Sequence, residues 1–325
     1  TNRMSDDGWV VSEGVTAADG RRATIFSTRW YQNYPITKFL ILAHMGSTFL
    51  FMQGFLIIYL IVKFLPIVVS VPVLALYLIH VLFSGAAESG HMESSVIRRL
   101  PWAFAIFEYF GGRVLIEDDA RTEPGRPYIF AVHPHGVHCF GQVPYFSCHP
   151  DNPFYKRFPS LRDKMHGTAA TAIFLVPFVR ELFLLLGTVS VGRATLERFL
   201  REGRSLNVVI GGEAEAMVTE NGKDSVVLEG RKGFVRLALR HGAGIVPTYT
   251  FHNADTFYLC SRGPAADLLR WAQRNFKVSI PLHWGVWGSP IPRPVPLVTA
   301  IGRPIEVPQP KEIGGEGGEG LVGEE

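Results

Sequence analysis

The residues best suited to chemistry form the string His133-Pro134-His135-Gly136, which ends an apolar run. Catalytic groups in open α/β sheets collect at the carboxyl ends of strands, so this position suits an active site. Pro134 fixes its own φ angle and holds His133 toward extended geometry, while Gly136 permits a close turn after His135. A neutral imidazole presented in this way can take a proton from an alcohol near neutral pH. The string therefore predicts a general base that acts on a hydroxyl group.

The same segment allows a second interpretation, as a zinc site. Side chains that can bind zinc are concentrated here: His133, His135, His138, Cys139, Cys148 and His149. Neither a Cys-x-x-Cys pair nor a His-Glu-x-x-His motif accompanies them. A cluster of histidines can also be purely structural. A general base, a metal site and a structural cluster all stay open on these residues alone.

A second string, GGEAEA at residues 211–216, follows another apolar run. Its two carboxylates, Glu213 and Glu215, emerge where a strand ends and a helix can begin. Either could orient an imidazole or bind a substrate hydroxyl. The alternative is structural, because glycines form turns and glutamates favour a helix N-terminus.

A third string, residues 229–244, has the pattern of an amphipathic helix that stops at Gly242. Lys232, Arg236 and Arg240 are four positions apart and share one face. Such a basic stripe can meet the phosphates of a nucleotide-bearing substrate or lipid head groups. It can equally be an ordinary solvated helix face.

The elements that would position these strings are short apolar runs ended by Gly, Pro or polar clusters, which are typical of buried strands. The runs are Arg113–Glu117, Tyr128–Val132, Gly187–Val191, Leu206–Ile210, Gly244–Phe251 and Leu297–Gly302. Helix-length stretches lie between several of them, at Arg193–Glu202 and Arg231–His241. This alternation predicts an α/β domain with a mostly parallel sheet.

Two charge-free segments, Phe39–Val62 and Phe64–Phe83, precede this domain. Each is long enough for a bilayer core, which takes roughly 20 apolar residues. Only Lys63 separates them, so we expect an N-terminal hydrophobic helical hairpin that spans or re-enters a membrane and returns the chain to its starting side. Basic residues outside both arms favour a cytosolic position for both flanks. A buried helical hairpin in a globular core is the alternative.

These features predict four regions along the chain. Residues 1–35 form a cytosolic N-terminal segment, 36–84 the hairpin, 85–312 the catalytic domain on the cytosolic side, and 313–325 a disordered tail rich in Gly and Glu.

Composition excludes several classes of protein. A chain with 47% hydrophobic and 19% charged residues is neither disordered nor a coiled coil. A formal net charge of +3 gives no broad field for nucleic acid, and three cysteines are too few for a disulfide framework. The chain lacks a G-x-S-x-G nucleophile elbow and a P-loop motif, which disfavours serine hydrolases and P-loop nucleotidases.

Taken in order, the charge-free hairpin, HPHG at 133–136, GGEAEA at 211–216 and RKGFVRLALRHGAGIVPTYTF at 231–251 resemble the type-2 diacylglycerol acyltransferase family. This family also includes monoacylglycerol and wax-alcohol acyltransferases. The resemblance runs from about Tyr31 to Pro308. It implies a membrane-anchored acyltransferase of the endoplasmic reticulum, often associated with lipid droplets, whose catalytic domain faces the cytosol.

The resemblance also implies which residues form the site. The family's histidine motif falls on His133, Pro134, His135 and Gly136, its Gly-Gly-x-x-Glu element on Gly211, Gly212 and Glu215, and its Arg-x-Gly-Phe element on Arg231, Gly233 and Phe234.

Two features depart from the expected patterns. Glycerol-phosphate acyltransferases, which look like distant relatives, carry an acid five residues after the histidine, where this chain has Phe140. A carboxylate from elsewhere must serve, or none does; we favour Glu215, with Glu213 behind it. The family's Tyr-Phe-Pro string is present only as Tyr34-Pro35.

The mechanism expected from the resemblance is direct acyl transfer from acyl-coenzyme A, a co-substrate, with no cofactor or metal. His135 takes the proton from the lipid hydroxyl, Glu215 holds the imidazole in the useful tautomer, and backbone amides stabilise the oxyanion. Arg231 or Lys232 binds coenzyme A phosphates.

The sequence leaves several alternatives open. The acceptor is diacylglycerol in the favoured interpretation, with monoacylglycerol and long-chain alcohols as alternatives. A non-catalytic membrane lipid-binding protein and a zinc-dependent membrane hydrolase represent other classes. The expected partners are acyl-coenzyme A, the lipid alcohol and membrane lipid, without nucleic acid. The oligomeric state stays open between a monomer and a homo-oligomer.

Overall fold

The computed structural model describes residues 2–308 except 5–8, 17–18, 29–46, 101–105, 107, 224, 261–262, 265, 269–270 and 272–281. The first part of the predicted hairpin, the Tyr34-Pro35 string and the predicted tail at 313–325 lie outside the described residues.

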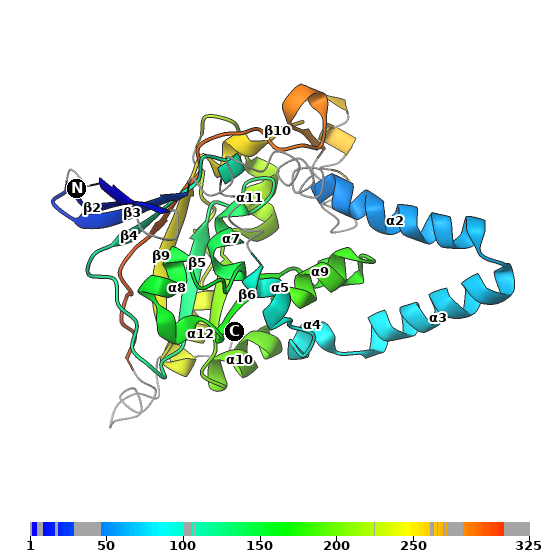
Figure 1. Ribbon diagram of the computed structural model, residues 1–325, viewed down its shortest axis with the longest axis horizontal. Helices are drawn as coiled ribbons and strands as arrows, with labels where there is room; N and C mark the ends of the chain where they lie inside the picture. The colour runs from blue at the N-terminus through cyan, green and yellow to red at the C-terminus, as the bar shows by residue number, and fades with distance from the viewer. Residues whose placement is uncertain are drawn as a thin grey trace.

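A large sheet forms the centre of the domain (Figure 1). Within the described residues its ten strands lie in the order β1 (Asn2–Met4), β2 (Trp9–Thr16), β3 (Arg22–Thr28), β4 (Arg113–Glu117), β12 (Val298–Ile301), β9 (Gly244–Phe251), β5 (Tyr128–His133), β8 (Ser205–Val209), β6 (Met165–Ala169) and β7 (Val189–Ser190). Strands β9, β5, β8, β6 and β7 are parallel, and β12 pairs antiparallel with β9 but parallel with β4. The predicted α/β fold with a mostly parallel sheet is confirmed.

The apolar runs of the sequence form strands close to their predicted bounds. Strands β4 and β9 have the predicted bounds. Strand β5 extends one residue beyond its predicted end, and β7, β8 and β12 differ from prediction by one or two residues at both ends. Strand β6 was not predicted, because its sequence MHGTA lacks the apolar run that marks the others. It pairs with β8 and β7, so tertiary pairing and not local pattern makes it a strand.

The N-terminal segment adds an antiparallel edge to this sheet. Strand β3 pairs with β4 in a register that places Ala23 opposite Glu117. The Glu117 carboxylate accepts hydrogen bonds from Arg21 Nη1 at 2.6 Å and from the Arg303 backbone N at 2.8 Å. The sheet therefore crosses the boundary that the sequence suggested between the N-terminal segment and the catalytic domain.

Helices surround the sheet and extend from it. The α-helices of the described residues are α2 (Ser47–Phe64), α3 (Ile67–Phe83), α4 (Ala86–Ser89), α5 (Ser95–Arg99), α7 (Val143–Phe146), α8 (Pro153–Arg157), α9 (Val179–Leu185), α10 (Arg193–Arg201), α11 (Gly212–Val218) and α12 (Gly233–His241). Short 3-10 turns are η1 (Phe140–Gln142), η2 (Pro159–Leu161), η3 (Thr171–Leu175), η4 (Asn253–Thr256) and η5 (Val286–Gly288). Both helices predicted from the domain sequence are present, as α10 and α12.

Two hydrophobic cores lie on the two faces of the sheet. Alternate residues of a strand point to opposite faces. On one face, Phe130 of β5 packs against Phe154 of α8. On the other face, Ile129 of β5 packs with Phe199 of α10 and Leu237 of α12. This second face is the one that leads to the candidate site.

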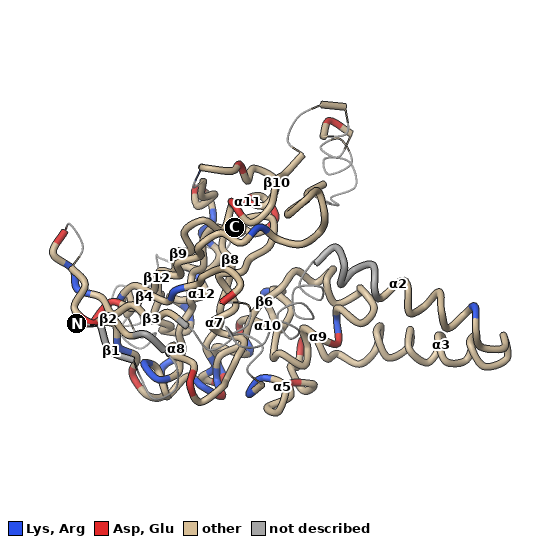
Figure 2. Tube along the Cα trace, turned by 45° about the horizontal axis from the view of Figure 1, so that its top comes forward, with Lys and Arg blue, Asp and Glu red and all other residues tan. Residues whose placement is uncertain are grey.

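Helices α2 and α3 form a hairpin that projects from the domain (Figure 1). The turn falls at Leu65 and Pro66, and Pro72 lies inside α3. Apolar side chains are exposed along it, and Figure 2 shows it nearly devoid of the charged residues that cover the domain. None of the described helices is both long enough and apolar enough to cross a bilayer.

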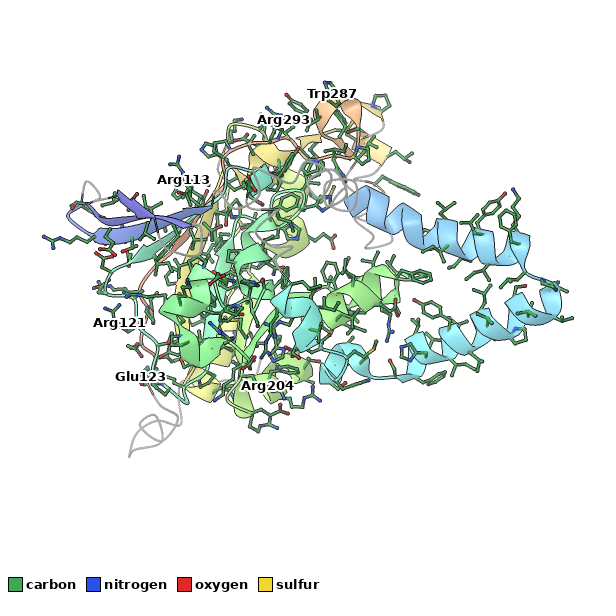
Figure 3. All side chains as sticks on the ribbon, in the orientation of Figure 1. Arg113, Arg121, Glu123, Arg204, Trp287 and Arg293 are labelled. Atoms are coloured by element: carbon green, nitrogen blue, oxygen red, sulfur yellow. The ribbon has the colours of Figure 1, made fainter. Side chains whose placement is uncertain are left out.

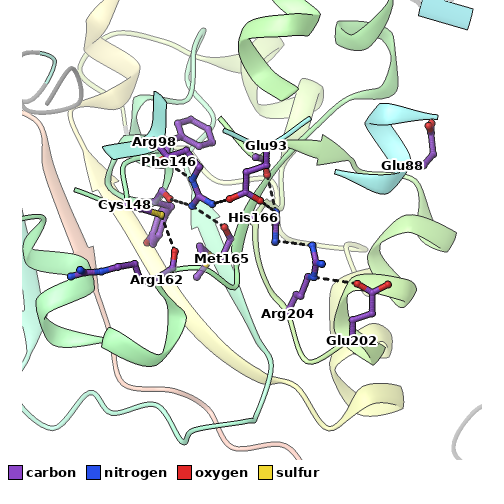
Figure 4. Close-up of polar contacts among 12 residues, drawn as sticks. Glu88, Glu93, Arg98, Phe146, Cys148, Arg162, Met165, His166, Glu202 and Arg204 are labelled. Carbon is purple, nitrogen blue, oxygen red and sulfur yellow. Dashed lines mark hydrogen bonds and ion pairs between the residues drawn. The ribbon is translucent and has the colours of Figure 1, made fainter. Parts of the chain in front are cut away.

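A buried polar cluster fixes the chain that follows the hairpin to the domain (Figure 4). Arg98 of α5 is 1% exposed and donates hydrogen bonds to the carbonyl oxygens of Phe146 and Met165, each at 3.1 Å. It also forms an ion pair with Glu93. His166 of β6 lies beside Glu93, with 3.6 Å between Nδ1 and Oε2. Burial first, and then the charge of Arg98, lower the pKa of His166 to about 3.

A small second sheet pairs β10 (Tyr258–Leu259) with β11 (His283–Trp284). It carries Trp287 on the following turn, 95% exposed, which Figure 3 shows at the outer edge of the molecule. His283 of β11 reaches back toward the domain, where its Nε2 atom lies 3.1 Å from that of His138.

Candidate active site

The HPHG string forms a tight turn at the carboxyl end of β5. The His133-Pro134 peptide bond is cis, and Gly136 has a φ of +61°. A Cβ atom on Gly136 would overlap the side-chain amide of Asn253, so glycine is required both by the backbone angle and by the space. The turn therefore places two imidazoles, His133 and His135, at the end of a central strand, as the sequence predicted.

Asn253 stabilises this turn through hydrogen bonds, and the sequence did not identify it as a site residue. Its fully buried side chain donates from Nδ2 to the carbonyl oxygens of His135 at 2.7 Å and His138 at 3.1 Å. Its Oδ1 accepts a hydrogen bond from the Phe140 backbone N at 3.2 Å. The only available signal was its position just after the β9 run, because β9 ends beside β5 in the sheet.

Glu215 of α11 lies directly against the HPHG turn. One carboxylate oxygen is 3.0 Å from Nδ1 of His133 and accepts a hydrogen bond from the Val227 backbone N at 2.9 Å. The other accepts from the backbone N of His135 at 2.7 Å. Burial favours a raised pKa for this carboxyl, but the hydrogen bonds from His133, Val227 and His135 outweigh it and leave the pKa below its ordinary value. Glu215 is thus a buried carboxylate that binds both histidine residues.

The contact between Glu215 and the histidines differs in detail from the sequence-based expectation. The carboxylate meets the imidazole of His133 and only the backbone of His135. The imidazole of His135 instead has Nδ1 2.8 Å from the Gly136 carbonyl oxygen. The ring that meets the carboxylate is therefore that of His133, two residues N-terminal to the expected one.

These contacts set the protonation of both rings. A carbonyl oxygen can only accept, so His135 carries its proton on Nδ1, and the Glu215 carboxylate likewise assigns a proton to Nδ1 of His133. Burial lowers the pKa of His135, which keeps this ring neutral at neutral pH. Within the described residues, no hydrogen-bond partner meets Nε2 of either ring. The Nε2 lone pair of the neutral His135 ring can therefore accept a proton from a substrate.

The glycines of the second string make room for Glu215. A Cβ atom on Gly211 would overlap the Glu215 carboxyl group, and Gly212 has a φ of +53°. Glu213, the second carboxylate considered from the sequence, is exposed in the first turn of α11. The structure thus brings Glu215, and not Glu213, to the histidines.

The third string borders a cavity of about 770 Å³ next to this site. Arg231, Lys232, Gly233 and Phe234 all line it. Arg231 also donates from Nη2 to the carbonyl oxygen of Gly211 at 3.2 Å, which links the cavity wall to the turn that holds Glu215. The cavity opens between α10 and α12 on the face of β5 and β8.

The side chains proposed as zinc ligands do not converge. Cys148 is buried with Sγ 2.8 Å from the carbonyl oxygen of Arg162, and His149 lies beside Asp151. Nowhere in the described part of the chain do three His, Cys, Asp or Glu side chains form a group that could hold a metal ion.

Known proteins show a clear relationship to this chain. The family model described as diacylglycerol acyltransferase matches residues 62–316. A 2-acylglycerol O-acyltransferase 3 from Homo sapiens is 32% identical, over 81% of this chain and 79% of its own length. Diacylglycerol O-acyltransferase 2B from Umbelopsis ramanniana is 31% identical, over 78% of this chain and 73% of its own. Diacylglycerol O-acyltransferase 2 from Bos taurus is 32% identical, over 65% and 62%.

Among solved structures, the 1-acyl-sn-glycerophosphate acyltransferase from Thermotoga maritima matches 86% of this chain and 90% of its own, with 13% identity and a TM-score of 0.35. That overlap is too weak to establish a shared fold. The family model and the relatives establish the family without this structure, since each spans most of the chain. This chain belongs to the diacylglycerol acyltransferase family.

Proposed function

We propose that this protein transfers a fatty acyl group from acyl-coenzyme A to the free hydroxyl of diacylglycerol and so forms triacylglycerol. Membership of the family supports an acyltransferase. The observation that carries the proposal is the neutral imidazole of His135 at the end of β5, in a turn held by Glu215, with an Nε2 atom that meets no partner among the described residues. A base that is neutral at cellular pH and close to a buried carboxylate is what proton removal from an alcohol needs.

In the proposed reaction, Nε2 of His135 takes the hydroxyl proton while the hydroxyl oxygen attacks the thioester carbonyl carbon. A C–O bond forms, and the tetrahedral oxyanion is stabilised by nearby backbone N–H groups. The C–S bond then breaks, and the imidazolium returns its proton to the departing sulfur, which leaves as free coenzyme A. Atoms and charge balance without a cofactor or a metal ion.

Glu215 acts on both histidines in this scheme. Its hydrogen bonds to the His133 ring and to the His135 backbone keep the turn in one orientation. It would also stabilise positive charge that develops on either ring.

His133 is a second candidate for the base. Its ring contacts Glu215 directly, and a carboxylate partner of this kind is typical of catalytic histidines. His133→Ala and His135→Ala separate the two assignments. If His135 is the base, its loss costs far more activity than the loss of His133.

The relatives share one type of reaction, but their names give more than one acyl acceptor. Matched proteins include diacylglycerol O-acyltransferases and a 2-acylglycerol O-acyltransferase. Both names support a partly acylated glycerol, and we favour diacylglycerol. Monoacylglycerol and long-chain alcohols are the alternatives within the same chemistry.

We further propose that the α2–α3 hairpin inserts into the endoplasmic reticulum membrane or a lipid droplet, with the domain in the cytosol. Support comes from large apolar side chains that face outward, among them Ile67 at 75%, Val68 at 76% and Phe83 at 79% exposure. Exposed apolar surface on this scale marks contact with lipid or protein. A membrane-inserted hairpin would deliver the lipid acceptor to the domain.

The test uses membranes that carry the full chain, radiolabelled oleoyl-coenzyme A, and diacylglycerol, monoacylglycerol or hexadecanol, with and without chelator. Labelled triacylglycerol, formed equally with chelator, is the expected product, and His135→Ala should abolish it. His91→Ala, which changes an exposed histidine near the hairpin, is the matched control and should retain activity. Absence of any ester would instead favour a lipid-binding protein, and chelator-sensitive release of oleate a metal-dependent hydrolase.

A further inference from the structure

The cavity beside the active site has an unusually cationic wall. Five basic side chains line it, from α10, from α12 and from the loop before α12: Arg193, Arg231, Lys232, Arg236 and Arg240. The lining residues, all within the described part of the chain, include no Asp or Glu. The basic stripe that the sequence left undecided between a ligand site and a solvated face thus borders a concave space.

One carboxylate partly balances this charge from outside the lining. Glu197 of α10 lies 2.9 Å from Nε of Arg193 and 3.4 Å from Nη1 of Arg240. Because the described lining residues include five basic side chains and no acidic one, the cavity wall is cationic. The ion pair between Glu197 and Arg240 also bridges α10 to α12.

The floor of the cavity is apolar and leads to the active site. Ile129 of β5 lies on the floor, and because alternate residues of a strand share a face, His133 lies on the same face farther along β5. At about 3.3 Å per residue, the four steps between them span roughly 13 Å. The cavity also reaches Ile210, at the end of β8 next to the Glu215 turn. A long ligand could therefore bind in the cavity and extend to the histidines.

Resting on the proposed acyl transfer, we infer that this cavity binds the phosphorylated adenosine end of acyl-coenzyme A. Arginine forks form strong, charge-assisted hydrogen bonds with phosphate oxygens, and the apolar floor suits the flat adenine ring. The volume lies in the range of small-molecule sites. The flexible pantetheine arm then runs along the β5 face and brings the thioester to His135.

The charge of the cavity favours coenzyme A over a phospholipid head group, because five basic side chains line it and coenzyme A carries three phosphate groups. Figure 1 shows α10 between α12 and the base of the hairpin, where Arg198 of α10 donates a hydrogen bond to the Glu88 carbonyl oxygen of α4.

The experiment compares oleoyl-coenzyme A with its analogue that lacks the 3′-phosphate, in wild-type membranes and in two single variants, Arg236→Gln and Arg193→Gln. Because the variants lie on different helices, poor folding of one leaves the other as a test. Arg201→Gln removes a charge from the exposed end of α10, outside the cavity, and is the matched control.

We expect KM for oleoyl-coenzyme A to rise about tenfold in each cavity variant, the value of one charge-assisted contact. The rate at saturating donor and KM for diacylglycerol should stay unchanged, and the wild-type preference for the 3′-phosphate should shrink in at least one variant. Adenosine 3′,5′-bisphosphate, titrated directly, should bind wild type and Arg201→Gln but bind the cavity variants more weakly.

The inference fails if the cavity variants keep wild-type KM and wild-type bisphosphate affinity. It also fails if they lose binding to vesicles of anionic phospholipid while bisphosphate binding persists, which would mark a head-group site. Failure of the proposed function looks different, because wild-type protein would then form no ester at all. In that event the bisphosphate titration still decides what the cavity binds.

Discussion

The molecule contains two buried clusters built from the same kinds of residue, and only one of them is suited to catalysis. One cluster joins Glu215 to the histidines at the end of β5. The other joins Glu93 to Arg98 and His166 where the hairpin meets the domain (Figure 4). Each combines a glutamate with a histidine whose pKa is lowered by burial, at His135 and at His166.

The clusters differ in how completely their polar atoms are satisfied. In the hairpin cluster, His166 has Nδ1 3.1 Å from the Gly187 carbonyl oxygen and Nε2 3.4 Å from Arg204 Nη1, so both ring nitrogens are occupied. In the β5 cluster, Nδ1 of His135 is held but Nε2 meets no partner among the described residues. A histidine with hydrogen bonds at both ring nitrogens serves to hold the structure together. A histidine with one unbonded ring nitrogen beside a cavity can act as a base. The residue types in the two clusters are alike, so the difference in role depends on whether the Nε2 atom of the histidine has a hydrogen-bond partner.

The largest effect on stability is expected at Arg98. Arg98→Met leaves Glu93 without its cation and removes the donors to the Phe146 and Met165 carbonyl oxygens. Breaking a buried pair in this way costs about 3–5 kcal/mol in the free energy of unfolding. The exposed neighbour Arg99→Met is the control and should change little. Thermal unfolding that is equal for the two variants would show that the hairpin cluster is not a structural joint.

The largest effect on activity after loss of the base is expected at Glu215. In Glu215→Gln only one side-chain oxygen remains to accept hydrogen bonds from His133, Val227 and the His135 backbone, so the turn loses its fixed orientation and its charge. We expect the rate of ester formation to fall about 100-fold. Glu213→Gln, two residues away and exposed, is the matched control. Equal losses in the two variants would remove Glu215 from the site.

A smaller effect is expected at Asn253, which supports the HPHG turn without facing a substrate. Asn253→Ala leaves carbonyl oxygens of the turn without a donor and opens space beside Gly136. The free energy of unfolding should fall by about 1–3 kcal/mol, and ester formation should fall by more than stability explains. Retained activity in folded Asn253→Ala protein would show that the turn holds itself.

An effect that is absent at neutral pH and appears only in acid is expected at His166. Its pKa of about 3 in the folded state lies below the ordinary value of 6.5, so between these values the unfolded chain binds a proton that the folded chain does not. Stability contributed by the neutral ring is complete above pH 6.5 and is lost as pH falls toward 3, by about 1.4 kcal/mol per pH unit. His166→Gln should flatten this slope, as measured by denaturant unfolding from pH 7 to pH 5. An unchanged slope would mean that His166 is not the titrating group.

Much of the fold could be predicted from the sequence because buried strands appear in it as short runs of apolar residues. The YIFAV run is apolar because β5 is buried on both faces, and GIVPTYTF starts with apolar residues where β9 is buried; both strands have the expected positions. HPHG and GGEAEA follow such runs, so their meeting at one edge of the sheet was predictable. The comparisons confirm the family and the acyltransferase class inferred from these strings.

What could not be predicted depends on contacts between distant residues. Arg98 resembles its neighbour Arg99 in sequence, and only packing against β6 buries one and not the other. Asn253 lies in an ordinary loop sequence, and its role appears only once β9 is placed beside β5. The choice of His133 over His135 as the ring that meets Glu215 depends on the turn geometry, which residue types do not record.

The assignment of catalysis to the β5 cluster is tested by comparing His135→Ala with His166→Gln in the same membranes. Triacylglycerol formation is measured per mole of folded protein, with the folded fraction taken from thermal unfolding. We expect His135→Ala to lose about 10³-fold in rate while its unfolding temperature stays near wild type. We expect His166→Gln to keep a near wild-type rate per folded molecule. Equal rates in the two variants, or wild-type activity in His135→Ala, would contradict the assignment of catalysis to the β5 cluster.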